Sequence, residues 1–367
     1  MCGLSLSKPS AVPSRHAQGV HGLSLYPSPV PSSRVKAAVG IGLASLLLLA
    51  GCGNDEPAAD AASPSPTAAP TSASPSATPT PTPKPKPVKA SNNFDKVTVT
   101  GGYGKTPKVK VDTPWAIDKT RTKVLDASNG QVVTEGQTVE VNYFGVNGRT
   151  GKKFDESFSR GQPVAFSLAQ VVPGFSKGLE GQHKGSRVLI AMPGKDGYDP
   201  MGGNPQAGIE VGDTLIFVVD LVDVQLAGPK GKTVQPKAGL PTVTDKGGRP
   251  EITVPESAPP TSLQVQPLIM GEGKKVGAND TITFNYLWVR WSDGKVLEET
   301  YSGQPANSAL SGLLPGMVKG LTDQTVGSRV LLVVPPADGY PDGNATPSIK
   351  PGETLVLVVD LLFTQSQ

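Results

Sequence analysis

The sequence predicts an α+β protein with two similar domains, each an antiparallel β-sheet wrapped around one short helix. Three observations lead to this prediction: a long internal repeat, strand-like alternation of polar and apolar residues, and only one short helix candidate in the core of the repeated unit. The chain has 367 residues, which is enough for two domains of ordinary size.

The first segment, residues 1–52, has the features of an export signal. Arg34 and Lys36 precede an apolar run that is too short for a comfortable membrane span and that ends in leucine, alanine, glycine and Cys52. This ending resembles the bacterial lipobox, whose cysteine is acylated and becomes the first residue after cleavage. We therefore expect lipidation at Cys52 and a lipid anchor on the extracytoplasmic face of a bacterial cell membrane. The alternative is a short core helix that ends in cysteine. The residues before Arg34 are polar and rich in proline, so we expect a mis-assigned start, with Val35 as the initiator.

Residues 53–93 are rich in proline, alanine, serine and threonine. Such a segment cannot bury a core and favours extended polyproline conformation, so we predict a disordered linker. About 40 residues at ~3 Å each would span on the order of 100 Å. This reach suits a tether that lifts the domains off the membrane, although a linker without a role fits the composition equally well.

An internal repeat organises the rest of the chain. Residues 141–143, 185–189 and 196–198 recur at residues 284–286, 327–331 and 338–340. The offset between the copies falls from 143 to 140 residues along the chain, as expected when small deletions lie in loops. We place domain 1 at residues 94–227 and domain 2 at residues 241–367. The linker between them, residues 228–240, is rich in glycine, proline and lysine.

Within each copy the pattern predicts strands. Residues 138–143 alternate polar and apolar side chains, as a half-buried strand does. Residues 214–221 are β-branched and mostly apolar, which suits a central strand, and residues 187–192 form another strand that Pro193 ends. The helix candidate of the core unit runs from about Gly174 to Gly181, directly after Pro173.

Composition excludes several classes of function. The formal net charge of +3 is small and no long lysine or arginine cluster is present, so we expect no nucleic-acid partner. Both cysteines, Cys2 and Cys52, precede the predicted domains, which therefore have neither a disulfide nor a thiolate. The sequence contains no metalloprotease, P-loop or nucleophile-elbow motif, so we expect no cofactor and no metal.

Five motifs in order resemble those of the FKBP-type peptidyl-prolyl cis-trans isomerases. They lie at residues 141–163, 171–179, 185–187, 197–198 and 214–221. The resemblance covers roughly Thr122 to Val224, and a diluted match covers roughly Leu263 to Phe363. It implies an FKBP-like fold for both domains and rotation of X–Pro bonds in exported proteins as the activity. The partners that it implies are proline-containing polypeptides and the macrolide inhibitors of the family, with the membrane reached through the lipid anchor only.

The resemblance also implies an aromatic pocket in the first copy. Tyr143, Phe154 and Phe217 match the family's pocket walls, and Phe175 matches the pocket floor, where many relatives have tryptophan. Each of these residues taken alone is more often core than site, and only the ordered set of motifs reverses that judgement. Phe166 we expect to belong to the core.

The remaining family positions surround this pocket. Val171 and Val172 match an apolar pair whose backbone contacts the ligand, and Ile209 matches a residue of the flap over the pocket. Tyr198 matches a tyrosine whose hydroxyl reaches a substrate carbonyl. Val164 replaces an aromatic residue that is common in relatives, which leaves one wall thinner.

Two charged residues complete the implied site. Asp155 matches the pocket carboxylate and Arg160 a neighbouring basic residue. Asp155 acts either electrostatically on the distorted substrate carbonyl or by holding Tyr143 and Arg160 in place, and we favour the positioning role. Outside this family context Asp155 would be a turn carboxylate and Arg160 a solvated charge.

The second copy is expected to be degenerate as a catalyst. It keeps Tyr286, Tyr340 and Ile349, but lacks a counterpart of Arg160. Its other site positions hold Leu297, Glu298, Ala306, Met317 and Leu357. We therefore expect a preserved fold with little aromatic wall and weak or absent isomerase activity.

Two rival functions remain open from the sequence. One is a chaperone-like lipoprotein that binds proline-containing segments without catalysis. The other is a solute-binding lipoprotein whose two lobes close on a small ligand, which the tandem repeat of short domains disfavours.

Overall fold

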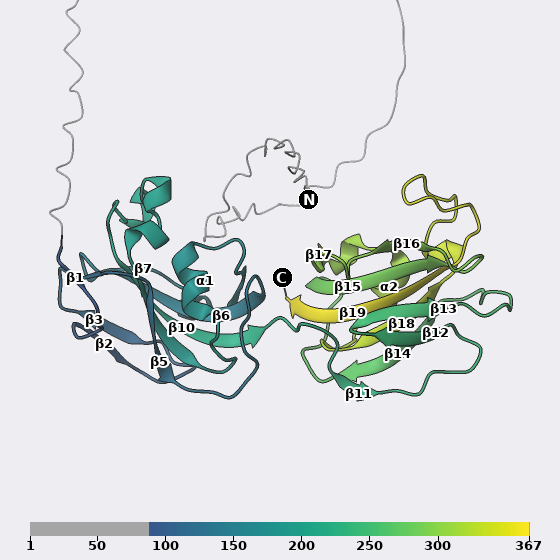
Figure 1. Cartoon of the computed structure of the whole chain (residues 1–367), viewed down its shortest axis with the longest axis horizontal. Coiled ribbons are helices and arrows are strands. Elements are labelled where there is room, and N and C mark those ends of the chain that lie inside the picture. The colour runs from purple at the N-terminus through teal and green to yellow at the C-terminus, as the bar shows by residue number, and fades with distance from the viewer. Residues whose placement is uncertain (1–87, 367) are drawn as a thin grey trace, which may run out of the picture. The chain divides into compact units, whose positions relative to one another are not determined.

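The computed structural model describes residues 88–366 and contains two related sheets, one for each copy of the repeat (Figure 1). The predicted signal, Cys52 and most of the predicted tether lie outside the described residues. No helix within residues 88–366 is long and apolar enough to cross a membrane.

The first copy forms a six-stranded sheet in the order β5-β9-β10-β6-β7, with β8 also paired to β6. All of its pairings are antiparallel. The strands are β5 (Arg121–Asp126), β6 (Thr138–Asn147), β7 (Lys153–Glu156), β8 (Val164–Ser167), β9 (Arg187–Met192) and β10 (Leu215–Val224). Short 3-10 turns occupy Phe158–Arg160, Gly194–Asp196, Asp199–Met201 and Pro205–Ala207.

Alternation along the central strand β10 divides the copy into two apolar layers. Leu215, Phe217 and Val219 belong to the cluster that contains the helix. Ile216 and Val218 belong to a second cluster on the other face of the sheet. A strand that is apolar on both faces must be covered on both, which is why this copy needs packing partners on each side.

The helix α1 (Pro173–Leu179) lies directly on β9, and it ends two residues before the predicted boundary. Its close approach depends on two glycines one turn apart. A Cβ on Gly174 would lie 2.6 Å from Met192, and a Cβ on Gly178 would lie 2.6 Å from Ile190. The absence of these side chains brings Phe175 into the core, where it is only 1% exposed.

A β-hairpin covers the opposite face of the sheet. Its strands are β2 (Val97–Thr100) and β3 (Lys108–Val111), and its valines pack against the second apolar cluster. Arg187, fully buried, pairs with Asp220 at 2.5 Å. The same guanidinium donates hydrogen bonds to the backbone oxygens of Gly101 and Lys105 at 2.5 and 2.6 Å. Because every group of the buried pair has a partner, the pair fixes where the hairpin sits.

The second copy repeats this plan with a seven-stranded sheet in the order β11-β14-β18-β19-β15-β16, with β17 paired to β15. Its strands are β11 (Gly231–Thr233), β14 (Gln264–Gly271), β15 (Thr281–Arg290), β16 (Val296–Glu299), β17 (Ala306–Ala309), β18 (Arg329–Val334) and β19 (Leu355–Gln365). The helix is α2 (Pro315–Leu321), with 3-10 turns at Leu310–Gly312 and Pro336–Asp338, and the covering hairpin is β12 (Thr242–Lys246) with β13 (Arg249–Thr253). Arg329 and Asp360 form the corresponding buried pair at 2.6 Å.

Regular structure extends into both segments that were predicted as linkers. Strand β1 (Ala90–Ser91) pairs in parallel with β4 (Ala116–Ile117), inside the predicted tether of residues 53–93. Strand β11 lies inside the predicted linker of residues 228–240 and pairs with β14. Both strands are short and lie at an edge, where backbone hydrogen bonds suffice and no apolar pattern marks them in the sequence.

Candidate active site

Phe217 and four other aromatic rings of the first copy form one cluster in the layer between the sheet and the helix. The Phe217 ring centroid lies 5.4 Å from that of Phe154, 5.4 Å from that of Phe175 and 6.4 Å from that of Tyr143. The first two contacts are edge-to-face, at interplanar angles of 86° and 81°. This arrangement is the one that aromatic quadrupoles favour. The four rings predicted for walls and floor therefore lie in one cluster.

Phe166, which we expected to belong to the core, is the fifth ring of this cluster. Its centroid lies 5.8 Å from that of Tyr143 and 5.9 Å from that of Phe175. It is only partly buried, like Phe154. Phe166 follows Val164 by two residues on β8, so both point to the same face of the strand. The Phe166 ring packs against the core cluster, as expected, beside the position where Val164 leaves the wall thin.

Strand register places the rings of Phe154 and Phe217 against each other. Gly145 on β6 pairs with Phe217 on β10 and with Asp155 on β7. A Cβ on Gly145 would lie 2.6 Å from the Phe154 ring. The missing side chain at the centre of the sheet thus makes the space that Phe154 fills from the edge strand.

The valine pair stands at the entry to the helix. Val172 precedes Pro173 as the N-cap residue of α1 and is 7% exposed, while Val171 is half-buried. Both pack against the aromatic cluster. Pro173 presets the first helical turn, which fixes the direction in which the preceding backbone runs.

Asp155 joins the aromatic cluster to a positive charge. The Tyr143 hydroxyl donates a hydrogen bond to Asp155, and the guanidinium of Arg160 lies 2.5 Å from the other carboxylate oxygen. The Asp155 side chain is 12% exposed and that of Arg160 is 39% exposed. Burial, and then the hydrogen bond to Asp155, raise the pKa of Tyr143 well above its usual range. Tyr143 therefore stays a neutral donor at physiological pH, and the carboxylate is engaged by two partners within the protein.

A backbone latch holds Tyr143 in place. Its amide N–H donates to Ser157 Oγ at 2.9 Å, and its carbonyl accepts from the Ser157 amide at 2.9 Å. The Ser157 hydroxyl donates in turn to the side-chain oxygen of Asn142 at 3.3 Å. The second copy repeats this latch with Thr300 bonded to Tyr286 and Asn285.

The long connection between β9 and β10 brings in the last two predicted residues. Tyr198 is 5% exposed and Ile209 is 2% exposed, and both belong to the same apolar cluster as Phe217. Ile209 forms an isolated antiparallel bridge with Asn204, with hydrogen bonds of 2.8 and 2.9 Å between their backbones. The ten predicted residues thus come together from one helix, three strands and three connections.

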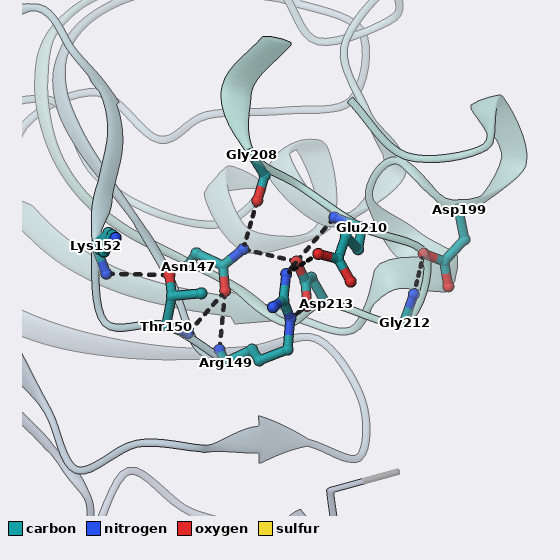
Figure 2. A network of polar contacts seen from close by, with 9 residues as sticks. All are labelled: Asn147, Arg149, Thr150, Lys152, Asp199, Gly208, Glu210, Gly212 and Asp213. Carbon is teal, nitrogen blue, oxygen red and sulfur yellow. Dashed lines mark hydrogen bonds and ion pairs between the residues drawn. The ribbon is translucent and has the colours of Figure 1, made fainter. Parts of the chain in front are cut away.

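The connection between β9 and β10 contains the predicted flap residue Ile209, and we call it the flap. A polar clamp, made of Asn147, Arg149, Glu210 and Asp213, joins the flap to the end of β6, as Figure 2 shows. Arg149 lies 2.6 Å from Asp213 and 3.0 Å from Glu210. The Asn147 amide donates to Asp213 at 2.7 Å and to the carbonyl of Gly208 at 3.4 Å. The clamp contacts Gly208 and Glu210, the two neighbours of Ile209 in the chain. These contacts fix the position of Ile209 in the apolar cluster.

The clamp also sets the charge state of its buried acid. Burial raises the pKa of Asp213, but hydrogen bonds from Arg149, the Glu210 amide and Asn147 outweigh it and hold the pKa below its usual value. This clamp could not be predicted from the sequence, because its members are ordinary turn residues whose partners lie more than 60 residues away.

The second copy gathers its own residues in the corresponding layer. Met317, Ile349 and Leu357 are buried there, and Tyr286, Leu297 and Tyr340 are half-buried against them. The expected loss of aromatic wall is only partly correct, because Trp288 occupies the position of Gly145. Its ring centroid lies 5.4 Å from that of Tyr286, which lies 5.6 Å from that of Phe284. Trp288 was not among the expected site positions, because the equivalent Gly145 carries no side chain in the first copy.

Within residues 88–366 no group of three or more histidine, cysteine, aspartate or glutamate side chains could hold a metal ion. The first copy instead offers an apolar, mostly buried set of rings, with a tyrosine on the flap connection and a carboxylate at the edge. Such a site can bind an apolar group and orient it, but it presents neither an activated nucleophile nor a proton-transfer pair.

Two stretches of the chain, residues 130–222 and 272–362, match the family model described as FKBP-type peptidyl-prolyl cis-trans isomerase. Over 105 residues the chain is 37% identical to the FKBP-type peptidyl-prolyl cis-trans isomerase FkpA of Escherichia coli strain K12, which covers 29% of this chain and 37% of that protein. Over 98 residues it is 42% identical to the FK506-binding protein of Streptomyces anulatus, covering 26% of this chain and 78% of that protein. The crystal structure of FkpA from Escherichia coli is similar at 36% identity with a TM-score of 0.27, covering 29% of this chain and 47% of that one. The chain thus matches well under half of the full length of FkpA.

Proposed function

The chain belongs to the FKBP-type peptidyl-prolyl cis-trans isomerases, and from this premise we propose that its first copy accelerates rotation about X–Pro bonds in exported polypeptides. The observation that carries the proposal is the aromatic cluster around Phe217, which joins Tyr198 and Ile209 in one layer within the first matched stretch. Its substrates are then proline-containing segments that are accessible on unfolded or newly exported chains.

The chemistry of rotation suits such a site. The amide barrier of ~18–20 kcal/mol comes from the partial double bond, and no covalent bond has to break. X–Pro bonds have nearly balanced cis and trans forms, yet they interconvert over tens of seconds or longer. The rotated amide loses resonance and is less polar at its oxygen, so an apolar, water-poor environment favours it over the planar ground state.

Individual residues take different parts in this proposal. The rings of Phe154, Phe175 and Phe217 bind the proline ring and exclude water. The Tyr198 hydroxyl orients the substrate backbone through a hydrogen bond. Asp155 is a positioning residue, since its two oxygens are already engaged by Tyr143 and Arg160. Lowering the barrier by about 4 kcal/mol would accelerate rotation about a thousandfold.

A protease-coupled isomerisation assay on the full chain tests the proposal. We expect catalysed cis-to-trans rotation of a proline tetrapeptide, and a clear loss of turnover in Tyr198→Phe without loss of folded structure. Tyr103→Phe is the matched control, because Tyr103 is 40% exposed and lies outside the aromatic cluster. Peptide binding without any rate enhancement would instead support the non-catalytic, chaperone-like function.

We further propose that macrolide inhibitors compete for the same site, as the name of the Streptomyces anulatus relative suggests for that protein. Inhibition of the coupled assay by FK506 tests this. A rate that is unaffected by saturating macrolide would contradict it.

The location of the protein is also a proposal. Cys52, with its preceding apolar run and basic residues, supports lipid anchoring on the extracytoplasmic face of a bacterial membrane. Labelling with radioactive palmitate in a bacterial host should mark the wild-type chain and not Cys52→Ser. Equal labelling of both chains would contradict anchoring at this residue.

A further inference from the structure

The second copy fills the position of the first copy's aromatic cluster with a different set of side chains. Trp288 stands opposite Leu357 in the β15–β19 ladder, where the first copy has Gly145 opposite Phe217. Leu297 replaces Phe154 on the neighbouring strand. The large side chain therefore stands on β15, whereas the first copy has its large side chains on β7 and β10, the two strands that flank the equivalent β6. Phe284, Tyr286 and Trp288, spaced by two residues, now form a continuous aromatic stripe on β15.

A carboxylate without a cationic partner lies beside this stripe. Glu298 pairs with Trp288 in the β15–β16 ladder, as Asp155 pairs with Gly145, so it occupies the same register position. None of the ion pairs in the described part of the chain involves Glu298, whereas Asp155 is paired with Arg160. Glu298 is also exposed, so a ligand can reach it.

Two tyrosines of the second copy, Tyr286 and Tyr340, respond to this charge. Burial, followed by the hydrogen bond to Glu298, raises the pKa of Tyr286 to about 12. Burial, followed by the charge of Glu298, also raises the pKa of Tyr340. No cation opposes the shift at either tyrosine, whereas Arg160 opposes it at Tyr143. The carboxylate therefore acts on both hydroxyl groups of the site.

The stripe also contains an unsatisfied donor. The indole Nε1 of Trp288 is buried, in a residue that is 8% exposed, and it has no hydrogen-bond partner among the described residues. A buried N–H without an acceptor is costly, and the indole of Trp115 in the first copy has the same property, so the donor alone does not indicate a ligand.

We propose that the second copy is a binding site for an extended polypeptide segment in which a lysine or arginine adjoins an apolar residue such as proline. The apolar residue packs on the stripe of Tyr286 and Trp288, and the basic side chain pairs with Glu298. A segment with an acidic residue at that place is rejected by like-charge repulsion. This site is separate from that of the first copy and does not depend on the proposed isomerase activity there.

Indole N–H signals of the full chain give a readout that is specific to the second copy. Of the three tryptophans, only Trp288 lies in the cluster with Tyr286. Trp115 and Trp291 lie in the clusters on the opposite faces of their sheets, so they serve as internal references. The first copy has no tryptophan at its aromatic cluster, so peptide bound there does not report through an indole of that site.

The ligands are capped hexapeptides that differ only in the residue before proline: lysine, norleucine or glutamate. We expect saturable movement of the Trp288 signal with the lysine peptide, about fivefold weaker binding of the norleucine peptide, and weaker binding still of the glutamate peptide, as for an exposed ion pair. The preference should shrink with added salt. Equal binding of the three peptides, or no movement of the Trp288 signal at millimolar lysine peptide, would overturn the proposal.

Two charge-neutralising variants complete the test. Glu298→Gln should bind the lysine and norleucine peptides equally well, with the tyrosine contact retained by the amide oxygen. Glu272→Gln removes the same charge from an exposed position of the same copy and should keep the fivefold preference. If both variants lost the preference equally, the net charge of the copy and not Glu298 would be responsible. Loss of isomerase activity in the first copy would leave all of these outcomes unchanged.

Discussion

The contact between Arg160 and Asp155 allows the two possible roles of the carboxylate to be separated by experiment. If Asp155 only positions Tyr143, removing Arg160 weakens the site. If its charge acts on the substrate carbonyl, removing Arg160 unmasks that charge and should strengthen the effect. We therefore predict how far kcat/KM of X–Pro isomerisation falls below the wild-type value in Asp155→Asn, in Arg160→Met and in the double variant.

The structure sets the expected magnitudes. The ion pair is partly exposed, with Arg160 39% and Asp155 12% accessible, so it contributes about 1 kcal/mol and its loss lowers kcat/KM about fivefold. Asp155→Asn loses the ion pair and also weakens the hydrogen bond from Tyr143, which adds about another 1 kcal/mol. We expect a fall of about thirtyfold for Asp155→Asn. The double variant should resemble it, because both substitutions remove the same contact.

The assay is the protease-coupled measurement over a range of peptide concentrations, with thermal unfolding recorded for every variant. The fall should appear in kcat as well as KM, while the unfolding temperature changes little because both side chains lie at the edge of the core. An increase of kcat in Arg160→Met would refute the positioning role. Additive losses in the double variant would also refute it.

Three further predictions concern the surroundings of these residues. Gly145→Ala places a methyl group 2.6 Å from the Phe154 ring, so it should lower stability by about 1–3 kcal/mol and impair isomerisation; urea unfolding that matches the wild type would contradict the packing argument. Phe217→Leu removes the ring that contacts three others and should cost about 1–2 kcal/mol and most of the activity; retained activity would show that the cluster is not the site. The pKa of Asp213 is lowered in the folded state, so its contribution to stability is complete above the unfolded pKa of about 3.9 and is lost as pH falls through the lower folded value. Asp213→Asn should therefore destabilise the chain at pH 6 and much less at pH 2, as measured by urea unfolding, and an equal loss at both pH values would contradict this assignment.

The fold was predictable because local and long-range signals agree. Alternation along β6 and β10, the proline at the first position of α1 and the repeat itself all indicate the same α+β unit, and the structure confirms it twice. The covering hairpins could not be predicted, since they lie outside the motifs and their place is fixed by Arg187 and Arg329. An arginine in a strand pattern does not reveal that its partners are an aspartate on the next strand and two distant carbonyl groups.

The site was predictable to the extent that motifs carry it. Eight of the ten expected residues lie in the apolar cluster of the first copy or pack against it, and Asp155 and Arg160 are joined to it through the Tyr143 hydroxyl. Their individual roles remain predictions. Phe166, which we expected to belong to the core, packs against the same cluster as a partly buried side chain. The clamp at Asp213 was missed because three strands and the helix separate the residues that meet there.

The second copy shows why a list of lost site residues does not describe what replaced them. Gly145 faces Phe217 across one ladder and Trp288 faces Leu357, so the aromatic member of the pair stands on the other strand in the second copy. A close-packed interior resists an empty position as well as a crowded one, and therefore a loss on one strand is compensated on its partner. The exchange transfers the aromatic surface to the strand that also carries Tyr286, beside a carboxylate that lacks its cation. The second copy thus has an aromatic stripe on β15 and the unpaired carboxylate of Glu298 where the first copy has its aromatic cluster. Its function follows from what this stripe and this carboxylate bind.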